Sequence, residues 1–161
     1  AREFSEIFLP EVPSEQQLAA IYEASRGCVW FVNSCKIGMG LKKSERVGFF
    51  SIIRLTAEPV GLYEPNNLTP FQLNRPHIPG PKPLPHGLYI GARGPKAIRP
   101  RGWMLQHLRS RIDVFFEGGG NVVFTRPVTE DGLRLAKKLG FEPVMVDRQG
   151  LGNIYKLNGG D

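Results

Sequence analysis

The chain of 161 residues is 41% hydrophobic and 22% charged, so it can bury a core and does not have the composition of a disordered protein. No apolar run approaches the roughly 18 residues that span a bilayer, and residues 1–10 lack a signal-peptide pattern, so we expect neither a membrane partner nor secretion. The formal net charge of +6 admits nucleic acid, anionic lipid or a phosphorylated ligand without choosing among them.

The N-terminal residues predict a strand followed by a helix. The strand is expected at residues 4–9, where prolines end it, and Ser14 is a good N-cap for a helix over residues 15–25. Apolar side chains at helical spacing should form its buried stripe, namely Leu18, Ile21 and Tyr22.

Two further strands should form an antiparallel hairpin. Residues 28–33 are a nearly continuous apolar run, which is typical of a buried central strand. Residues 47–55 predict the partner strand, and the Gly- and Lys-rich residues 37–46 predict a long connection between the two. Cys28 and Cys35 would lie on opposite faces of a strand, and their spacing fits no zinc pattern. We therefore expect reduced thiols, no metal and a cytoplasmic protein.

The next stretch, about residues 56–87, is rich in proline. Eight of the 14 prolines of the chain fall in it, which leaves little capacity for helix or sheet. A short helical piece is expected near residues 58–63. Because the flanking segments look like strands of one sheet, we expect an ordered flap, with a mobile insertion of no function as the alternative.

The centre of the second half is a strand, a basic loop and a helix. The strand is expected at residues 88–92 and the helix from about Gly102 to Val114. Its apolar stripe should consist of Met104, Leu105, Leu108 and Ile112. The first amides of a helix have no intrahelical partner and sit at the positive end of its dipole, so the junction predicts an anion site.

The remaining residues predict the rest of one sheet. Residues 122–125 should form a buried strand parallel to residues 88–92, because a helix crosses between them. Thr129 should cap a helix that ends at a left-handed Gly140, and residues 143–147 and 153–157 should form a closing hairpin. The order β-α-β-β-flap-β-α-β-α-β-β predicts an α+β (mixed α/β) fold, with a mixed, mostly antiparallel sheet flanked by helices and holding one parallel pair.

Two segments resemble the GNAT superfamily of N-acetyltransferases. Arg99-Pro-Arg-Gly102-Trp-Met104 resembles the Arg/Gln-x-x-Gly-x-Gly/Ala turn whose amides hold the pyrophosphate of acetyl-CoA, with Met104 in place of the last small residue. Residues 129–144 resemble the helix that ends in Leu-Gly-Phe before the closing hairpin. The resemblance runs from about Val47 to the C-terminus and is weak over the first 45 residues.

The resemblance implies a single GNAT-like domain over residues 1–161, with acetyl-CoA as co-substrate between two splayed parallel strands. A backbone N–H between Ile90 and Ala92 would polarise the thioester carbonyl, and a bulky Met104 would narrow the phosphate loop. The implied cofactor-binding residues are Ile90, Gly91, Ala92, Arg99, Pro100, Arg101, Gly102, Trp103, Met104, Arg134 and Lys137, with Lys96 and Arg93 as helpers. The Trp103 indole itself is expected in the core. Arg134 and Lys137 suit an adenosine 3′-phosphate or, equally, the dipole of their own helix.

The catalytic groups are not assigned by the resemblance. Many family members carry a general-acid tyrosine at the position of Ala136, so we consider Tyr89, His86 and Tyr155 as candidates. His77 lies in the flap with His86, near the expected entry of the acceptor. His107 is expected to be a surface or half-buried residue of the helix.

Three functions remain open. The first, which we favour, is acetyl transfer from acetyl-CoA to a primary amine of a small molecule, peptide or protein. The second is a GNAT-like acyl-CoA-binding protein without transfer, which Met104 and Ala136 motivate. The third is a basic, RNA-directed protein, so nucleic acid is a less favoured partner. A homodimer is left open, and the acceptor is not predictable from these residues.

Overall fold

The structure is a computed structural model that describes residues 15–24, 28–38, 41–63, 76, 78–79, 85–93 and 98–159. Within them the order is α2 (Glu15–Ala24), β1 (Val29–Gly38), β2 (Leu41–Leu55), α3 (Ala57–Tyr63), β3 (Gly87–Arg93), α4 (Ile98–Glu117), β4 (Val122–Thr125), α5 (Glu130–Lys138), β5 (Glu142–Pro143) and β6 (Tyr155–Asn158). The strand expected at residues 4–9 and the cap expected at Ser14 lie outside the described residues.

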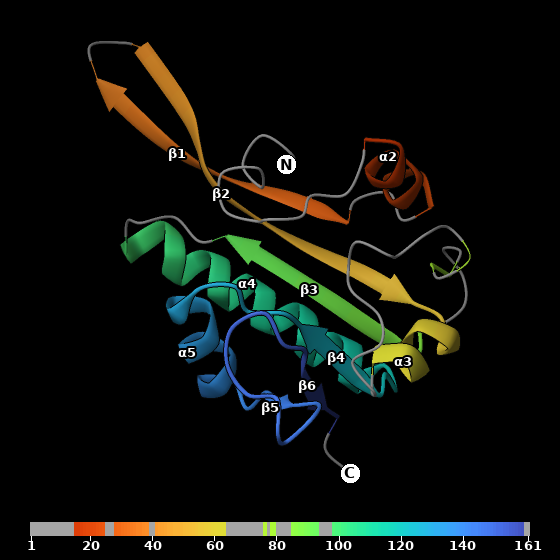
Figure 1. The fold of residues 1–161 in the computed structure, drawn as a ribbon. Helices are drawn as coiled ribbons and strands as arrows, with labels where there is room; N and C mark the ends of the chain where they lie inside the picture. The colour runs from red at the N-terminus through yellow and green to blue at the C-terminus, as the bar shows by residue number, and fades with distance from the viewer. Residues whose placement is uncertain are drawn as a thin grey trace.

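The fold is a mixed α+β arrangement around a six-stranded sheet of order β1-β2-β3-β4-β6-β5 (Figure 1). The β3–β4 pair is parallel, and the other neighbouring strands are antiparallel. The expected architecture, including the parallel pair created by a helical crossover, is therefore confirmed in the described residues. The predicted strands at residues 88–92 and 122–125 correspond to β3 and β4.

The two faces of the sheet carry separate apolar clusters because successive strand residues point to opposite faces. Leu88 and Ile90 of β3 pack with α4 and α5 on one face, whereas Tyr89 packs with Ile21 of α2 on the other. The stripe predicted for α4 is confirmed, since its members are buried or partly buried: Met104, Leu105, Leu108 and Ile112. Tyr22, predicted on the buried side of α2, is 54% exposed, so that expectation was wrong.

The connection between β1 and β2 differs from the prediction. The strands pair continuously from Val29↔Ser51 to Gly38↔Leu41, so two residues rather than a long loop join them. Because β3 pairs with β2 only from Phe49 onward, residues 33–38 and 41–48 form a two-stranded arm, here called the β-ribbon, that extends beyond the sheet (Figure 1). Gly and Lys are depleted in strands, but cross-strand pairing overrides that weak preference.

Part of the Pro-rich stretch is described. The short helix predicted near residues 58–63 is confirmed as α3. Ile78 is buried in the cluster that contains Tyr89. Residues 64–75, 77 and 80–84 lie outside the described residues, so the flap as a whole stays a prediction. Cys28 is a buried free thiol, as expected, and nothing is described of the Cys35 side chain.

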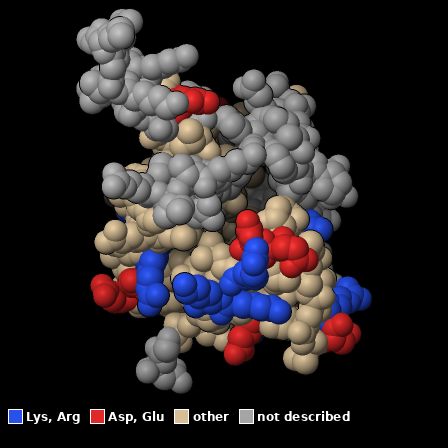
Figure 2. All heavy atoms as spheres, turned by 90° about the vertical axis from the view of Figure 1, so that its left-hand side faces the viewer, with Lys and Arg blue, Asp and Glu red and all other residues tan. Residues whose placement is uncertain are grey.

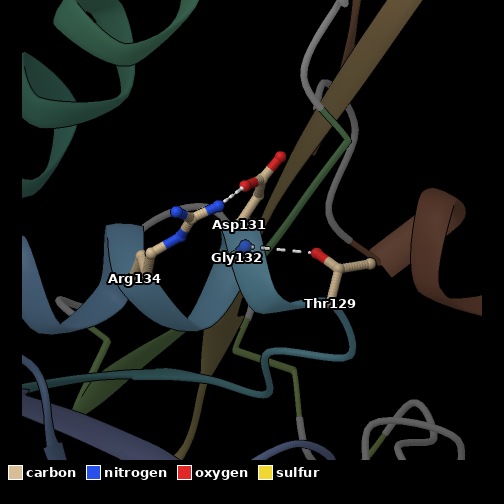
Figure 3. Close-up of polar contacts among 4 residues, drawn as sticks. All are labelled: Thr129, Asp131, Gly132 and Arg134. Carbon is tan, nitrogen blue, oxygen red and sulfur yellow. Dashed lines mark hydrogen bonds and ion pairs between the residues drawn. The ribbon is translucent and has the colours of Figure 1, made fainter.

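Helix α5 has the termini that its sequence predicts. The Thr129 hydroxyl accepts a hydrogen bond from the Gly132 N–H at 3.1 Å, which caps the first turn (Figure 3). At the other end, Gly140 has φ of 88°, and the N–H groups of Gly140 and Phe141 donate to Lys137 and Ala136. This is a Schellman cap, so the predicted left-handed end is confirmed.

The closing hairpin is shorter than predicted. β5 contains only Glu142 and Pro143, which pair with Lys156 and Tyr155 of β6. The rest of the connection is held by other bonds, because the Gly152 N–H donates to the Pro127 carbonyl at 2.8 Å. Residues 145–147 therefore lie in a loop rather than in the predicted strand.

One substitution, Gly to Ala, has opposite expected effects at two positions. Gly140→Ala should lower the free energy of unfolding by about 1 kcal/mol, because an L-residue is disfavoured at positive φ. A β-carbon there would meet only Leu157 at an ordinary 3.5 Å, so the cost is conformational. Gly102→Ala should raise the free energy of unfolding by about 0.5–1 kcal/mol, since Gly102 is inside α4 and a β-carbon there meets nothing within 4 Å. Urea unfolding measures both, and a destabilising Gly102→Ala would contradict the helical assignment.

Candidate functional site

The parallel pairing between β3 and β4 stops before β3 does. It runs from Gly87↔Val122 to Ile90↔Thr125, and the Thr125 hydroxyl donates to the Ile90 carbonyl at 3.0 Å at its end. β3 continues to Arg93, still paired with β2 on its other side. Residues 91–93 therefore present one backbone edge that β4 does not cover.

The direction of the backbone groups along this edge follows from the neighbouring bonds. The Ile52 N–H donates to the Cys28 carbonyl at 2.8 Å, so the backbone N–H and C=O groups of Ile52 point towards β1 and away from β3. The partner of Ile52 across the antiparallel pair is Ile90, whose backbone N–H and C=O groups must then point towards β4. Backbone groups alternate in direction along a strand, so those of Ala92 point the same way as those of Ile90. Because Ile90 is within the parallel ladder, the N–H of Ala92 is the one that points to this side beyond the end of β4.

The helix that follows this edge begins earlier than the sequence indicated. α4 starts at Ile98 instead of Gly102, so the predicted loop-to-helix junction at residues 99–103 is itself helical. In the described first turn, the amides of Ile98 and Arg99 precede the first intrahelical bond. Pro100 lacks an N–H and fits the first turn for that reason. The helix-start amides therefore lie upstream of Gly102.

The charges at the start of α4 oppose its dipole. Its first turn contains no acidic residue, and the sequence places Arg99 and Arg101 there. In α5, by contrast, Glu130 and Asp131 occupy the first turn and lysines the last, as the dipole favours. Cations at a helix N-terminus are unfavourable unless an anion accompanies them, so the start of α4 has the electrostatics of an anion site.

Two residues of the motif are placed differently from the expectation. Met104 is 2% exposed and packs in the core between α4 and the sheet, so it does not narrow a phosphate loop. Trp103, expected in the core, is 57% exposed, and its ring stacks on His107, which is half-buried as predicted. A helix turns by about 100° per residue, so neighbours such as these face different surroundings.

The two tyrosine candidates are both buried. Tyr89 is 7% exposed, and burial raises the pKa of its hydroxyl, against the opposing effects of the Arg126 charge and a hydrogen bond with the Arg126 backbone. The Tyr155 hydroxyl is buried and accepts a hydrogen bond from the Gly150 N–H at 2.9 Å. His86 precedes β3, six residues and about 20 Å from Ala92, so it is not at this site.

The motif comparison did not point to Arg126. It follows the last residue of β4, and its Nε donates to the Gly152 carbonyl at 2.6 Å. The guanidinium thereby joins the β5–β6 loop to the end of the parallel pair. A cation directly after a buried strand was the only signal for it in the sequence.

The α5 cations lie on the surface. Arg134 is paired with Asp131, and both side chains are about three-quarters exposed, so the pair contributes little stability (Figure 3). Lys137 is also exposed, whereas Ala136 is buried and brings no acid to the site. Figure 2 looks onto the side where α5 lies and shows described Lys and Arg side chains there beside Asp and Glu side chains.

Some predicted site residues cannot be placed. Lys96 and His77 lie outside the described residues, and nothing is described of the side chains of Arg93, Arg99, Pro100 and Arg101. Among the residues that are described, no group of three or more His, Cys, Asp and Glu could hold a metal ion. In the same part of the chain, every helix is too short or too polar to span a bilayer.

Comparisons with known proteins add little. No family model matches the chain, and no curated protein matches its sequence. Among solved structures, the crystal structure of the KacTA-DNA complex is 13% identical, with 99% of this chain and 89% of that chain covered and a TM-score of 0.42. A likeness at this level carries no argument, so the function is argued from the geometry above.

Tyr89 gives a pH-dependent test of the site's packing. Its pKa is raised above the ordinary value of 10.0, so above pH 10 the unfolded chain releases a proton that the folded chain keeps. The free energy of unfolding should then fall as pH rises, by up to about 1.4 kcal/mol per pH unit from this group. Urea unfolding between pH 9 and 11 should show a shallower fall for Tyr89→Phe. Identical slopes would contradict a buried, protonated Tyr89.

Proposed function

We propose that this chain is an acyl-CoA-dependent N-acetyltransferase of the GNAT type, which transfers an acetyl group to a primary amine. The observation that carries the proposal is the early end of the β3–β4 ladder at Ile90 and Thr125. Beyond it, a strand edge that β4 does not cover is followed after only four residues by the start of α4. A pantetheine arm can pair with such an edge like a strand, while its pyrophosphate meets the helix amides.

Each part of this site has a defined task. The amides of Ile98 and Arg99, with the neighbouring arginines, would hold the pyrophosphate at the positive end of α4. The Ala92 N–H would donate to the thioester carbonyl and stabilise the negative charge that develops on its oxygen. The acceptor amine attacks as the neutral base, a C–N bond forms, the C–S bond breaks and the thiolate takes up a proton.

Proton transfer in this scheme does not use a tyrosine of the described site. Tyr89 and Tyr155 are both buried, and the position of the family's general acid is Ala136. Water would accept the amine proton and supply the one that the thiolate needs. Catalysis then depends on positioning and on the Ala92 dipole, so we expect the rate to rise with pH until the acceptor amine is neutral.

The buried Ala136 also supports a second candidate, an acyl-CoA-binding protein that does not transfer the acetyl group. It predicts the same binding of acetyl-CoA without an acetylated product. Mass spectrometry after incubation with an amine panel separates the two, since a product heavier by an acetyl group excludes the second candidate.

Acetyl-CoA binding tests the helix start. Calorimetry should show binding, and Arg99→Glu should weaken it by at least tenfold, because the change replaces attraction to the pyrophosphate with repulsion. Arg148→Glu makes the same charge change in the exposed β5–β6 loop and should leave the affinity nearly unchanged. Equal effects of the two variants, or no binding by the wild type, would contradict the site.

Replacing Ala92 tests the polarising amide. Ala92→Pro removes an N–H that points away from β2, so it should spare the β2–β3 ladder. We expect kcat to fall about 100- to 1,000-fold, as for the loss of one oxyanion donor, with KM for acetyl-CoA changed much less. Ala92→Gly keeps the N–H and serves as the control, and thermal melting verifies folding. Full turnover by a folded Ala92→Pro would rule out this role.

A further inference from the structure

The net positive charge of the chain comes from two stretches. Residues 33–48 contain four cations and one carboxylate, and residues 93–101 contain four cations and no carboxylate. The formal net charge of the whole chain is +6, so the remaining residues together are close to neutral. The net positive charge is therefore local to these two stretches.

The fold brings both stretches to the same end of the sheet. The described part of the first is the β-ribbon, and the described parts of the second are the last residue of β3 and the first turn of α4. The pair Phe49↔Arg93 marks the point beyond which the ribbon continues without β3, for about 25 Å along β2. In Figure 1, the ribbon and the start of α4 extend towards the same side of the molecule.

Two features of this arrangement would favour an anionic partner. Within the ribbon, Lys36 and Lys43 are direct cross-strand partners, and like charges in that position destabilise a sheet. Arg99 and Arg101 are at the unfavourable end of the α4 dipole. A single pyrophosphate at the helix start would not relieve the ribbon, whereas an extended polyanion would relieve both.

An exposed ring stack lies on the same half of α4. Trp103 stacks on His107 with ring centroids 5.5 Å apart and planes 8° apart, although Trp103 is 57% exposed. His107 contacts Phe50, which is 1% exposed and itself stacks on Trp30 at 5.0 Å. The row of rings runs from the core to the surface, so it holds the Trp103 indole in a fixed orientation. Arg111 lies 5.9 Å from the Trp30 ring and adds a cation beside the row.

We propose that this end of the sheet binds a single-stranded nucleic acid. The β-ribbon and the start of α4 contact successive phosphates, and an unpaired base stacks on Trp103. Cations that follow a backbone, combined with an aromatic platform, are the usual means of holding single strands. A duplex does not present an unpaired base to the ring, and an anionic membrane offers no base at all. This inference goes beyond acetyl transfer and does not require it.

Trp103→Ala tests the stacking. Fluorescence anisotropy with a labelled single-stranded RNA and the matching DNA should show binding that the variant weakens by about 5- to 150-fold, the range for one stacked base. Tyr22→Ala is the matched control, since Tyr22 is 54% exposed on α2 across the sheet. Unequal losses for RNA and DNA would identify the preferred strand. No loss with either strand, or an equal loss in the Tyr22 variant, would overturn the proposal.

The ribbon is tested by the salt dependence of the same binding. Lys42→Glu with Lys43→Glu should weaken binding and lower the slope of log K against log salt by about 1.4, or about 0.7 for each phosphate that the variant no longer neutralises. Lys138→Glu with Arg148→Glu makes the same charge change on α5 and the β5–β6 loop and should preserve the slope. Equal slopes for the two double variants would overturn the assignment to the ribbon.

Further binding measurements separate this inference from the proposed function. Binding to a duplex of the same sequence, or to vesicles containing phosphatidylserine, as tightly as to the single strand would overturn it. Binding of acetyl-CoA but of neither oligonucleotide by the wild type would also overturn this inference. That result would leave the acetyltransferase proposal intact. Oligonucleotide binding without any acetyl-CoA binding would instead contradict the acetyltransferase proposal and support this one.

Discussion

The feature on which the site depends is a mismatch in strand length within the only parallel pair of the described sheet. β3 has seven residues and β4 four, so pairing must stop while β3 is still fixed by β2. The backbone of Ala92 is held in place on one side and uncovered by β4 on the other. A strand edge with fixed amide groups follows from strand length alone, and it needs no special side chain. The site that we propose there would therefore need no catalytic dyad.

The helix start and the strand edge act together because four residues join them. The strand supplies a directed N–H, and α4 supplies the positive end of its dipole with cations around it. Neither is specific alone, since strand edges and helix ends occur in every such fold. In the proposed function, their separation along the chain suits a ligand that is extended at one end and doubly anionic at the other. The charge on the β-ribbon exceeds what that ligand needs, which is why a second, longer anion is proposed.

Sequence reasoning succeeded where the signals are local. The ends of α5 were predictable because a capping threonine and a left-handed glycine each act within one turn. It failed where long-range contacts determine the local structure. The β-ribbon was missed because Gly and Lys indicate a loop, although pairing with β1 extends the strand. The start of α4 was misplaced because Pro100 resembles a loop residue while being tolerated in a first turn. The exposure of Trp103 could not be predicted, because it depends on which side of α4 faces Phe50.

The most direct measurement of the central claim is an amide NMR titration with acetyl-CoA. If the pantetheine arm lies along β3 and the pyrophosphate at the helix start, the largest changes should occur at Ala92, Ile98 and Arg99. Gly87, at the other end of the same strand, should change little. Chemical-shift changes that saturate at the amides of Ala92, Ile98 and Arg99, with little change at Gly87, would agree with the site. Changes centred on Gly87, or none at millimolar acetyl-CoA, would contradict it.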